Sequence, residues 1–268
     1  MQIGVMNHPA RDPVDEIEWI GKNGFEFVDF TLEPPAAAPE QVDVDAVRAA
    51  LQRNQLGVVA HTAYYLPLAS PFASVRRACL EEFRRALQAA HDIGAPVMNT
   101  HFHKPPKFFS EQQTVEWHAE VLGPLCDDAK QLEVTVVLEH IPFGGTNQLE
   151  IISDLMDEVP LLRFHLDSGH AKLERGSDRW DEYLDRLGEK LRHVHLSDND
   201  GTADQHLPLG SAPRSKTNWA EHIQKLKASG YDATITLEVF SPEKEHLLLS
   251  RDLLRSWWEL DSMDRHWA

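Results

Sequence analysis

The regular alternation of short apolar segments with longer amphipathic ones constrains the fold of this chain more than any other feature. Eight segments are short, rich in apolar and β-branched residues, and predicted to be strands. Between them, apolar residues recur three and four positions apart, which predicts helices. Such alternation favours parallel pairing through right-handed crossovers, and eight units predict a closed (β/α)8 barrel of the α/β class. The predicted strands cover residues 3–6, 25–30, 57–62, 96–101, 134–140, 163–167, 192–195 and 234–239.

Local signals mark where several predicted helices begin and end. Asp12 and Pro13 suit the cap and first position of the first helix, and Gly24 suits its end. Ser110 and Gln113 have the spacing of a capping box at the start of a helix over 110–131. Other helices are predicted over 44–54, 74–93, 147–158, 180–187, 218–229 and from Pro242 through Trp257. No linker or low-complexity stretch interrupts the pattern, so we expect residues 1–268 to form one barrel domain.

The acidity of the chain limits the partners that it can bind. Its 268 residues contain 26 Lys and Arg against 43 Asp and Glu, a net charge of −17. Such a surface repels nucleic acids and anionic membranes, and the basic residues form no cluster, so neither partner is expected. No apolar run reaches the length of a membrane span, and Met1 leads directly into a strand, which indicates a cytoplasmic protein. Cys79 and Cys126 lack metal or redox spacing and are expected to be buried free thiols.

Six of the predicted strands end in a side chain that can bind a metal ion. In a (β/α)8 barrel the chemistry lies at the carboxyl ends of the strands, where these side chains would converge. One strand-end histidine is more often structural than a ligand, but the same coincidence on six strands is not explained by packing. Imidazole and carboxylate are the ligands of borderline divalent metals, so the sequence predicts a metal site. The six residues are His61, His101, Glu139, Asp167, His195 and Glu238.

Two of these residues are carboxylates in otherwise apolar strands. Glu139 lies in VVLEH and Glu238 in ITLEV. A buried carboxylate costs several kcal/mol, about 3–5 when its partner is missing, unless a positive charge compensates it. No strand-end arginine is available for this role. A divalent cation between the two glutamates therefore explains them better than structural ion pairs.

Further candidates lie just beyond the strand ends. His170 follows the sixth strand, and Asp204 and His206 lie on the loop after the seventh. His101, at the end of the fourth strand, suits a ligand better than His103, which lies on the next loop and suits a substrate contact. Three other strand histidines are expected to point outward toward the helices: His140, His165 and His193. The remaining histidines lie in helical or terminal segments and are expected to have no role in the site: His8, His91, His118, His222, His246 and His266.

Several stretches together resemble the xylose isomerase-like TIM barrels, which include endonuclease IV and many sugar isomerases and epimerases. They are HTAYYLPLASP (61–71), VMNTHF (97–102), VVLEHIPFGGTN (136–147), HLDSGHA (165–171), HLSDNDGTADQHLPLG (195–210) and TLEV (236–239). The resemblance covers nearly the whole chain. In combination these stretches are specific for the superfamily, and much less so for a substrate.

The resemblance implies a set of metal ligands. Members with a single metal use a Glu, Asp, His, Glu quartet, which corresponds here to Glu139, Asp167, His195 and Glu238. The endonuclease branch holds three zinc ions with additional ligands. The positions that resemble those are His61, His101, His170, Asp204 and His206. One divalent ion (Mn, Mg, Zn or Co) is expected, and the ligand types suffice for up to three.

The first functional hypothesis from this resemblance is a metal-dependent isomerase or epimerase of carbohydrate metabolism, acting on a sugar or sugar phosphate. Such enzymes work through a metal-stabilised enediolate, with Glu139 and Glu238 exchanging protons at carbon. Glu33, after the second strand, resembles the sugar-acting branch. Ketose 3-epimerases typically have an arginine six positions after the strand-seven histidine, where this chain has Gly201, which argues against a free-ketose 3-epimerase. Lys104, Lys107, Arg214 and Lys216 are candidates for meeting a phosphate, and a homo-oligomer is compatible with the sequence.

Two alternatives belong to other classes of function. The nine candidate ligand residues support an apurinic-site endonuclease with several zinc ions. The net charge of −17 opposes it, as do the loops after the first two strands, which contain one arginine and no lysine. A barrel that binds a ligand without catalysis is the third hypothesis, and the intact pair of acid–base carboxylates argues against it. The sequence therefore favours the sugar enzyme.

Overall fold

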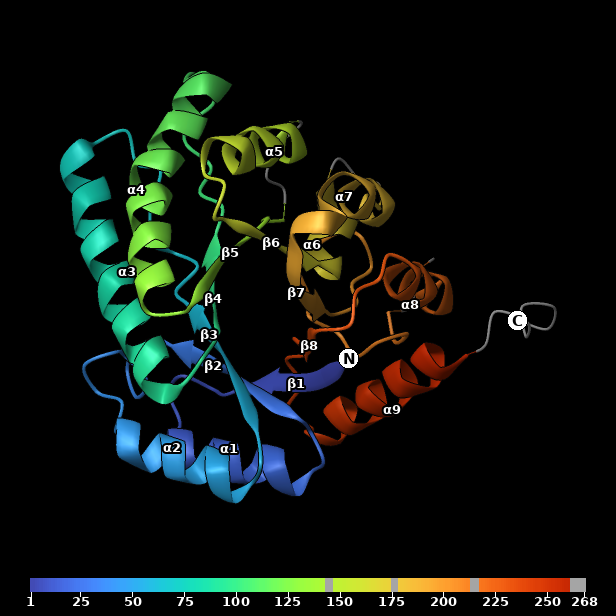
Figure 1. The fold of residues 1–268 in the computed structure, drawn as a ribbon. Coiled ribbons are helices and arrows are strands. Elements are labelled where there is room, and N and C mark those ends of the chain that lie inside the picture. Colours follow the sequence, from blue (N-terminus) through green and yellow to red (C-terminus); the bar gives the residue numbers. More distant parts are fainter. Residues whose placement is uncertain (143–146, 175–177, 213–216, 261–268) are drawn as a thin grey trace.

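Eight parallel strands form a closed barrel in the computed structural model, which describes residues 1–142, 147–174, 178–212 and 217–260 (Figure 1). Neighbouring strands follow chain order, and β1 pairs with β8 to close the barrel, with Val5 opposite Leu237. The predicted fold class is thus confirmed. The strands are β1 Gln2–Met6, β2 Phe27–Leu32, β3 Gly57–Thr62, β4 Val97–His101, β5 Thr135–Glu139, β6 Arg163–Asp167, β7 Leu191–Leu196 and β8 Thr234–Leu237.

Helices surround the barrel, because each strand passes into a segment whose apolar side faces it (Figure 1). Two predicted starts are confirmed: the Asp12 side chain accepts hydrogen bonds from the amides of Val14 and Asp15, and Ser110 with Gln113 forms a capping box. The helices are α1 Pro13–Lys22, α2 Val44–Arg53, α3 Ala73–Ile93, α4 Glu111–Gln131, α5 Gln148–Glu158, α6 Ser168–Leu173, α7 Trp180–Leu187, α8 Trp219–Ala228 and α9 Glu245–Glu259, with a 3-10 turn η2 Gly188–Lys190.

Two helices differ from the predicted pattern. The short α6 follows β6 without a loop, because the Asp167 carboxylate caps it by accepting a hydrogen bond from the amide of His170 at 2.6 Å. The last helix begins at Glu245 rather than at Pro242. Before it, the Ser241 hydroxyl accepts a hydrogen bond from the amide of Glu243, which holds this segment in a turn.

The main core lies between the strands and the helices, and an aromatic ring fills the barrel below the site. Gly4 leaves room for Phe27, since a Cβ at Gly4 would lie 2.6 Å from the ring. The Phe27 ring lies 6.1 Å from that of His193, which is also inside the barrel. The floor of the barrel is therefore apolar, and polar side chains collect above it.

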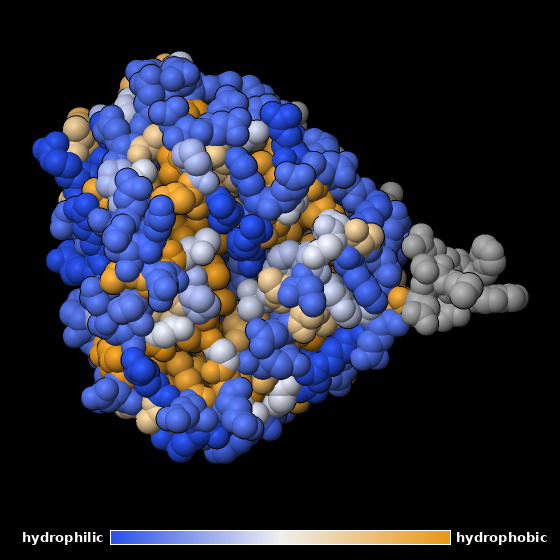
Figure 2. Space-filling model, viewed as in Figure 1, coloured by the Kyte–Doolittle hydropathy of each residue, from blue (hydrophilic) through white to orange (hydrophobic). Residues whose placement is uncertain are grey.

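The surface of the molecule is mostly hydrophilic, with hydrophobic residues gathered toward the centre of the view over the barrel (Figure 2). Cys79 and Cys126 are buried and unpaired, as predicted, and burial raises the pKa of both thiols to about 12. Among the described helices, none combines the length and apolar character required to cross a bilayer.

Candidate metal centre

Four buried side chains from the second half of the barrel converge at its carboxyl end. Glu139 and Asp167 end β5 and β6, His195 lies near the end of β7, and Glu238 follows β8. The strand register aligns them, since Asp167 pairs with His195, and His195 pairs with Thr236 two residues before Glu238. One nitrogen or oxygen atom of each lies within 4.8 Å of those of the other three. We call these four residues the quartet.

Three quartet atoms have no hydrogen-bond partner among the described residues. They are Asp167 Oδ2, His195 Nδ1 and Glu238 Oε2, and all three are buried. His195 Nδ1 approaches Glu238 Oε2 to 3.2 Å without the geometry of a hydrogen bond. Two ligands of one metal ion lie about 2.8–3.6 Å apart when each is about 2.0–2.2 Å from it and the angle between them is about 90–110°. Because buried polar atoms rarely lack partners, the quartet fits a divalent cation.

Electrostatics of the quartet point the same way. Burial raises the pKa of Asp167 to about 7, and the nearby Glu238 and Glu139 carboxylates add to this, although His170 opposes it. Burial lowers the pKa of His195, but Glu238 and Glu139 outweigh this and raise it well above its usual value. Three carboxylates thus share one buried space, and a cation would stabilise all three.

Glu139 is also surrounded by imidazoles from neighbouring strands. Its Oε2 lies 3.1 Å from Nε2 of His101 and 3.9 Å from Nε2 of His61, and these three residues form a second group of potential metal ligands. Its Oε1 lies 3.3 Å from Nδ1 of His170. Both ring nitrogens of His61 lack hydrogen-bond partners among the described residues.

A chain of polar groups continues from the quartet toward solvent. Asp204 Oδ2 lies 3.3 Å from Nε2 of His170 and 3.3 Å from Nε2 of His206. His206 Nδ1 in turn lies 3.4 Å from Glu238 Oε2. The structure therefore brings together all nine positions that were predicted as ligands or additional ligands.

Asp29, in the middle of β2, is a site residue that the sequence analysis missed. Its buried Oδ2 accepts hydrogen bonds from Nε2 of His195 at 2.7 Å, Nε2 of His193 at 3.1 Å and the Thr236 hydroxyl at 2.8 Å. With the Nε2 proton of His195 held by Asp29, loss of the other ring proton to a bound metal would leave Nδ1 with a lone pair for that metal. Burial raises the pKa of the Asp29 carboxyl, but the bonds from His193 and His195 outweigh this and hold it well below its usual range. A carboxylate in the apolar segment FVDF was the available signal.

The expected outward orientation is wrong for two of three strand histidines. His165 Nδ1 donates to Asn99 Oδ1 at 3.0 Å inside the barrel, and His193 contacts Asp29 there. Alternate residues of a strand point to the same side, so histidines two positions before Asp167 and His195 share their inward direction. The prediction holds for His140, whose ring stacks on Tyr183 of α7 at 4.2 Å.

A cavity of about 930 Å³ opens above the quartet. Its lining residues show which of the other predicted site residues could reach a ligand there. Glu33 lines it, and so does His8, which was expected to have no role. His103 does not line it and instead donates its backbone amide to His118 Nε2. Neither Lys104 nor Lys107 contributes to the cavity wall, whereas Arg214 and Lys216 lie outside the described residues. His266, which was expected to have no role in the site, also lies outside the described residues.

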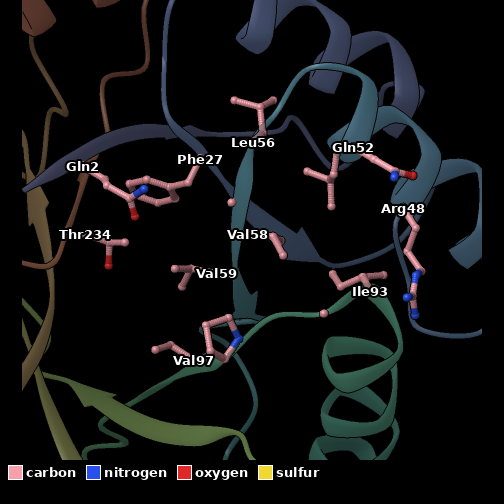
Figure 3. Close-up of a pocket in the computed structure, with 14 residues that line it drawn as sticks. Gln2, Phe27, Arg48, Gln52, Leu56, Val58, Val59, Ile93, Val97 and Thr234 are labelled. Atoms are coloured by element: carbon pink, nitrogen blue, oxygen red, sulfur yellow. The ribbon is translucent and has the colours of Figure 1, made fainter.

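A second cavity, of about 500 Å³, lies at the opposite end of the barrel near the start of the strands (Figure 3). Its labelled lining is mainly apolar, with Phe27, Leu56 and Val58, and includes Arg48 and Gln52 on one side. Among the described residues, no member of a group of potential metal ligands lines this cavity. The chemistry is thus concentrated at the carboxyl end of the strands.

Comparison with known proteins decides the family. A family profile described as "Xylose isomerase-like TIM barrel" matches residues 17–257. The chain belongs to this family. An uncharacterised protein from Methanocaldococcus jannaschii is 27% identical over 218 residues, covering 78% of this chain and 72% of that protein.

Two further matches are a sugar 3-epimerase and a protein described as similar to one. Fructoselysine 3-epimerase of Escherichia coli O157:H7 is 24% identical over 251 residues, 87% of this chain and 85% of that protein. The crystal structure of a D-tagatose 3-epimerase-like protein superposes with a TM-score of 0.81 at 23% identity, covering 97% of each chain. The chain is therefore similar to sugar epimerases in fold and has buried His, Asp and Glu groups suited to a metal.

Proposed function

We propose that the protein is a divalent-metal-dependent sugar isomerase or epimerase that moves a proton at a carbon atom next to the carbonyl of a ketose. The convergence of the four quartet residues, three of which have a buried side-chain atom without a hydrogen-bond partner among the described residues, carries the proposal. The similarity to fructoselysine 3-epimerase supports the sugar as substrate class.

The quartet supplies both the metal ligands and the acid–base groups of this proposal. A divalent ion bound there supplies a Lewis acid that polarises a carbonyl and stabilises negative charge on oxygen. Glu139 ends β5 and Glu238 follows β8, and their proximity supports a role for the two as a pair acting on the bound ketose. One carboxylate takes the proton from carbon, and the other returns a proton from the opposite side.

Histidines around the quartet are suited to hold the hydroxyl groups of a sugar. Burial, reinforced by the charge of His101, lowers the pKa of His61 to about 4, so that its ring is neutral at physiological pH. A neutral imidazole offers one donor and one acceptor, which matches a hydroxyl group. His61, His101 and His206 all line the cavity, and the unpartnered nitrogens of His61 make it the first choice for this contact.

Proton exchange with solvent tests the proposal directly. The purified protein, loaded in turn with Mn²⁺, Mg²⁺, Co²⁺ or Zn²⁺, is incubated with a panel of ketoses in D2O, and deuterium at the carbons beside the carbonyl is followed by NMR. We expect metal-dependent exchange that Glu238→Gln abolishes and that Glu243→Gln, an exposed change on the same loop, retains. Absence of exchange with every ketose and metal would reject the proposed chemistry.

A multi-zinc endonuclease is the second candidate, and one observation favours it. His61, His101 and Glu139 form a second ligand group beside the quartet, and Asp204 links His170 with His206. Metal content distinguishes the two functions. One divalent ion per chain, retained when His61 is replaced by Ala, supports the sugar enzyme, whereas loss of additional zinc in that variant supports phosphodiester chemistry.

A further inference from the structure

The walls of the 930 Å³ cavity carry opposite charges at two ends. The quartet end is acidic, with Glu139, Glu238 and Asp204 among the lining residues. Arg11, from the loop after β1, and Lys244, directly before α9, line the same cavity beside β1, across the closed barrel from β5, and we call this part the basic end. In a chain with a net charge of −17, two cations beside one cavity are a local exception.

Glu16 fixes both cations without using all of their donors. Its Oε1 lies 3.0 Å from Nζ of Lys244 and 3.4 Å from Nη1 of Arg11, while its Oε2 accepts the backbone amide of His8 at 3.3 Å. The carboxylate is nearly buried, with 11% of its side chain exposed, and leaves a net charge of +1 in the group. Lysine has three donor hydrogens and arginine five, so further donors are available for a ligand.

Trp19 adds to this positioning. The ammonium of Lys244 lies 4.2 Å from the centre of the Trp19 ring, which is cation–π geometry. Ring and carboxylate together hold the ammonium at the cavity wall before a ligand arrives. A pre-positioned charge loses less side-chain entropy on binding than a freely rotating lysine.

The size of the cavity leaves room for more than the atoms that would meet a metal. Its volume of about 930 Å³ lies near the upper end of the range, roughly 300–1,000 Å³, in which proteins enclose drug-sized ligands. Apolar residues, among them Val239 and Leu247, also line it. The acidic end is the part suited to a metal and a carbonyl, so the basic end is available for a distal group of the same substrate.

Building on the proposed sugar chemistry, we propose that the substrate is a ketose whose carbon chain ends in an oxyanion, held by Arg11 and Lys244. The oxyanion is a phosphate or a carboxylate at the carbon most distant from the carbonyl. Both groups accept charge-assisted hydrogen bonds from guanidinium and ammonium groups.

Binding of three matched ligands tests this assignment. D-fructose, D-fructose 6-phosphate and D-fructuronate differ only in the group at C6, and their affinities for the metal-loaded protein can be compared by calorimetry. We expect at least one of the two C6 anions to bind about tenfold more tightly than D-fructose, the factor of one charge-assisted hydrogen bond. The better of the two anions identifies phosphate or carboxylate as the group that this end recognises.

Four variants separate a direct contact from long-range charge. Lys244→Met and Arg11→Gln should each reduce the preference for the anion several-fold, and Lys244→Arg should retain it. Lys107→Met, an exposed change outside the cavity wall, is the matched control and should also retain it. Thermal unfolding of each variant verifies that it is folded.

The outcomes distinguish this inference from the proposed function. Equal affinities for the three ligands, or no binding of either anion, would overturn the inference even if proton exchange with D-fructose proceeds. An equal loss of preference in Lys107→Met would overturn it as well, because it would indicate net charge rather than a contact. Failure of the proposed function instead appears as absent proton exchange, a measurement that does not involve the C6 group.

Discussion

Two buried charged clusters in this molecule differ in how completely their atoms are paired. In the helical layer, Glu174 accepts from Arg179 Nη1 at 2.7 Å with one oxygen and from the Tyr183 hydroxyl at 2.5 Å with the other. We call Glu174, Arg179 and Tyr183 the shell cluster. In the barrel mouth, the quartet is buried to a similar degree, yet three of its atoms have no hydrogen-bond partner among the described residues.

The difference separates a structural role from a functional one. In the shell cluster each carboxylate oxygen has a donor, so its charge is compensated within the protein. The quartet places three carboxylates together with one imidazole, an arrangement suited to a cation from outside. Buried charge alone does not indicate function, whereas buried charge with unpartnered atoms does.

Asp167→Asn tests the mouth side of this comparison and should have the largest effect. The asparagine side chain keeps the oxygen that accepts a hydrogen bond from the backbone N–H of His170, so α6 retains its cap. The neutral side chain is, however, a poor metal ligand. We expect turnover to fall by about 10³-fold, within the range for loss of positioned acid–base chemistry, and bound metal to be lost. Proton-exchange rates and metal analysis measure both.

Stability provides the control for this variant. The metal-free Asp167→Asn protein should unfold at a temperature no lower than that of the metal-free parent, because a buried charge has been removed. The parent should gain stability on addition of metal, and the variant should not. A variant that unfolds readily even without metal would place Asp167 with the structural residues.

Glu174→Gln tests the shell side and should act on stability alone. The change leaves the Arg179 guanidinium, whose side chain is 2% exposed, without one of its two carboxylate partners. Loss of one member of a buried pair costs about 3–5 kcal/mol, which urea unfolding measures. Metal content should match that of the parent, and a loss of metal at unchanged stability would reverse the comparison.

Asp29→Asn should have a smaller effect, since Asp29 contacts the quartet rather than belonging to it. An amide offers one acceptor oxygen without charge, so it holds the Nε2 proton of His195 less firmly. We expect metal affinity to fall by about 10–100-fold, the usual effect of removing a partner of a ligand histidine. Competition with a chelating dye measures the affinity, and an unchanged affinity would exclude this positioning role.

The Asp178–His222 pair predicts a small pH dependence of stability outside the mouth. His222 Nε2 lies 3.0 Å from Asp178 Oδ2; burial lowers the pKa of His222, but this hydrogen bond outweighs it and raises the value. A raised histidine pKa contributes stability that is fully present below the unfolded value near 6.5 and is lost as pH rises through the folded value.

Asp178→Asn should therefore lower the free energy of unfolding by about 1 kcal/mol at pH 6 and by much less at pH 9. Burial raises the pKa of Asp178, but the bond from His222 outweighs it, so this contribution of the carboxylate is lost as pH falls through the acid range below 3.8. Urea titrations of metal-free parent and variant at both pH values give the difference. Equal destabilisation at pH 6 and pH 9 would indicate a neutral hydrogen bond instead.

The smallest expected effect concerns DNA. A labelled abasic duplex incubated with the protein and Zn²⁺, Mn²⁺ or Mg²⁺ should remain intact at physiological salt, because the net charge of −17 opposes binding to a phosphate backbone. Glu238→Gln is the control for contaminating nucleases. Nicking by the parent that disappears in this variant would show that the mouth performs multi-metal phosphodiester chemistry.

Much of the barrel and of its mouth could be predicted from the sequence. The eight apolar segments predict the number of strands. Glu139 and Glu238 can be recognised as site candidates because each is a charged residue at the end of an apolar strand. Parallel pairing then brings these ends to one side of the barrel, which local pattern alone is sufficient to establish.

The remaining features depend on contacts between distant parts of the chain. Asp29 carries the same signal as Glu139 but lies inside a strand, and its partner His195 is 166 positions away. The capping of α6 depends on the same Asp167 carboxylate that belongs to the quartet. Arg11 and Lys244 become neighbours through Glu16 only when β8 closes on β1.

The order of the quartet along the chain has a consequence for biosynthesis. Its members occupy β5, β6, β7 and the end of β8, and Glu238 comes from the last strand to leave the ribosome. The same strand closes the barrel through the pairing of Leu237 with Val5. A nascent chain therefore exposes His61 and His101 early but lacks the full ligand set until the barrel can close. In the proposed enzyme, metal loading by the quartet would therefore follow completion of the fold, and capture of ions by a partial chain would be limited to weaker sites.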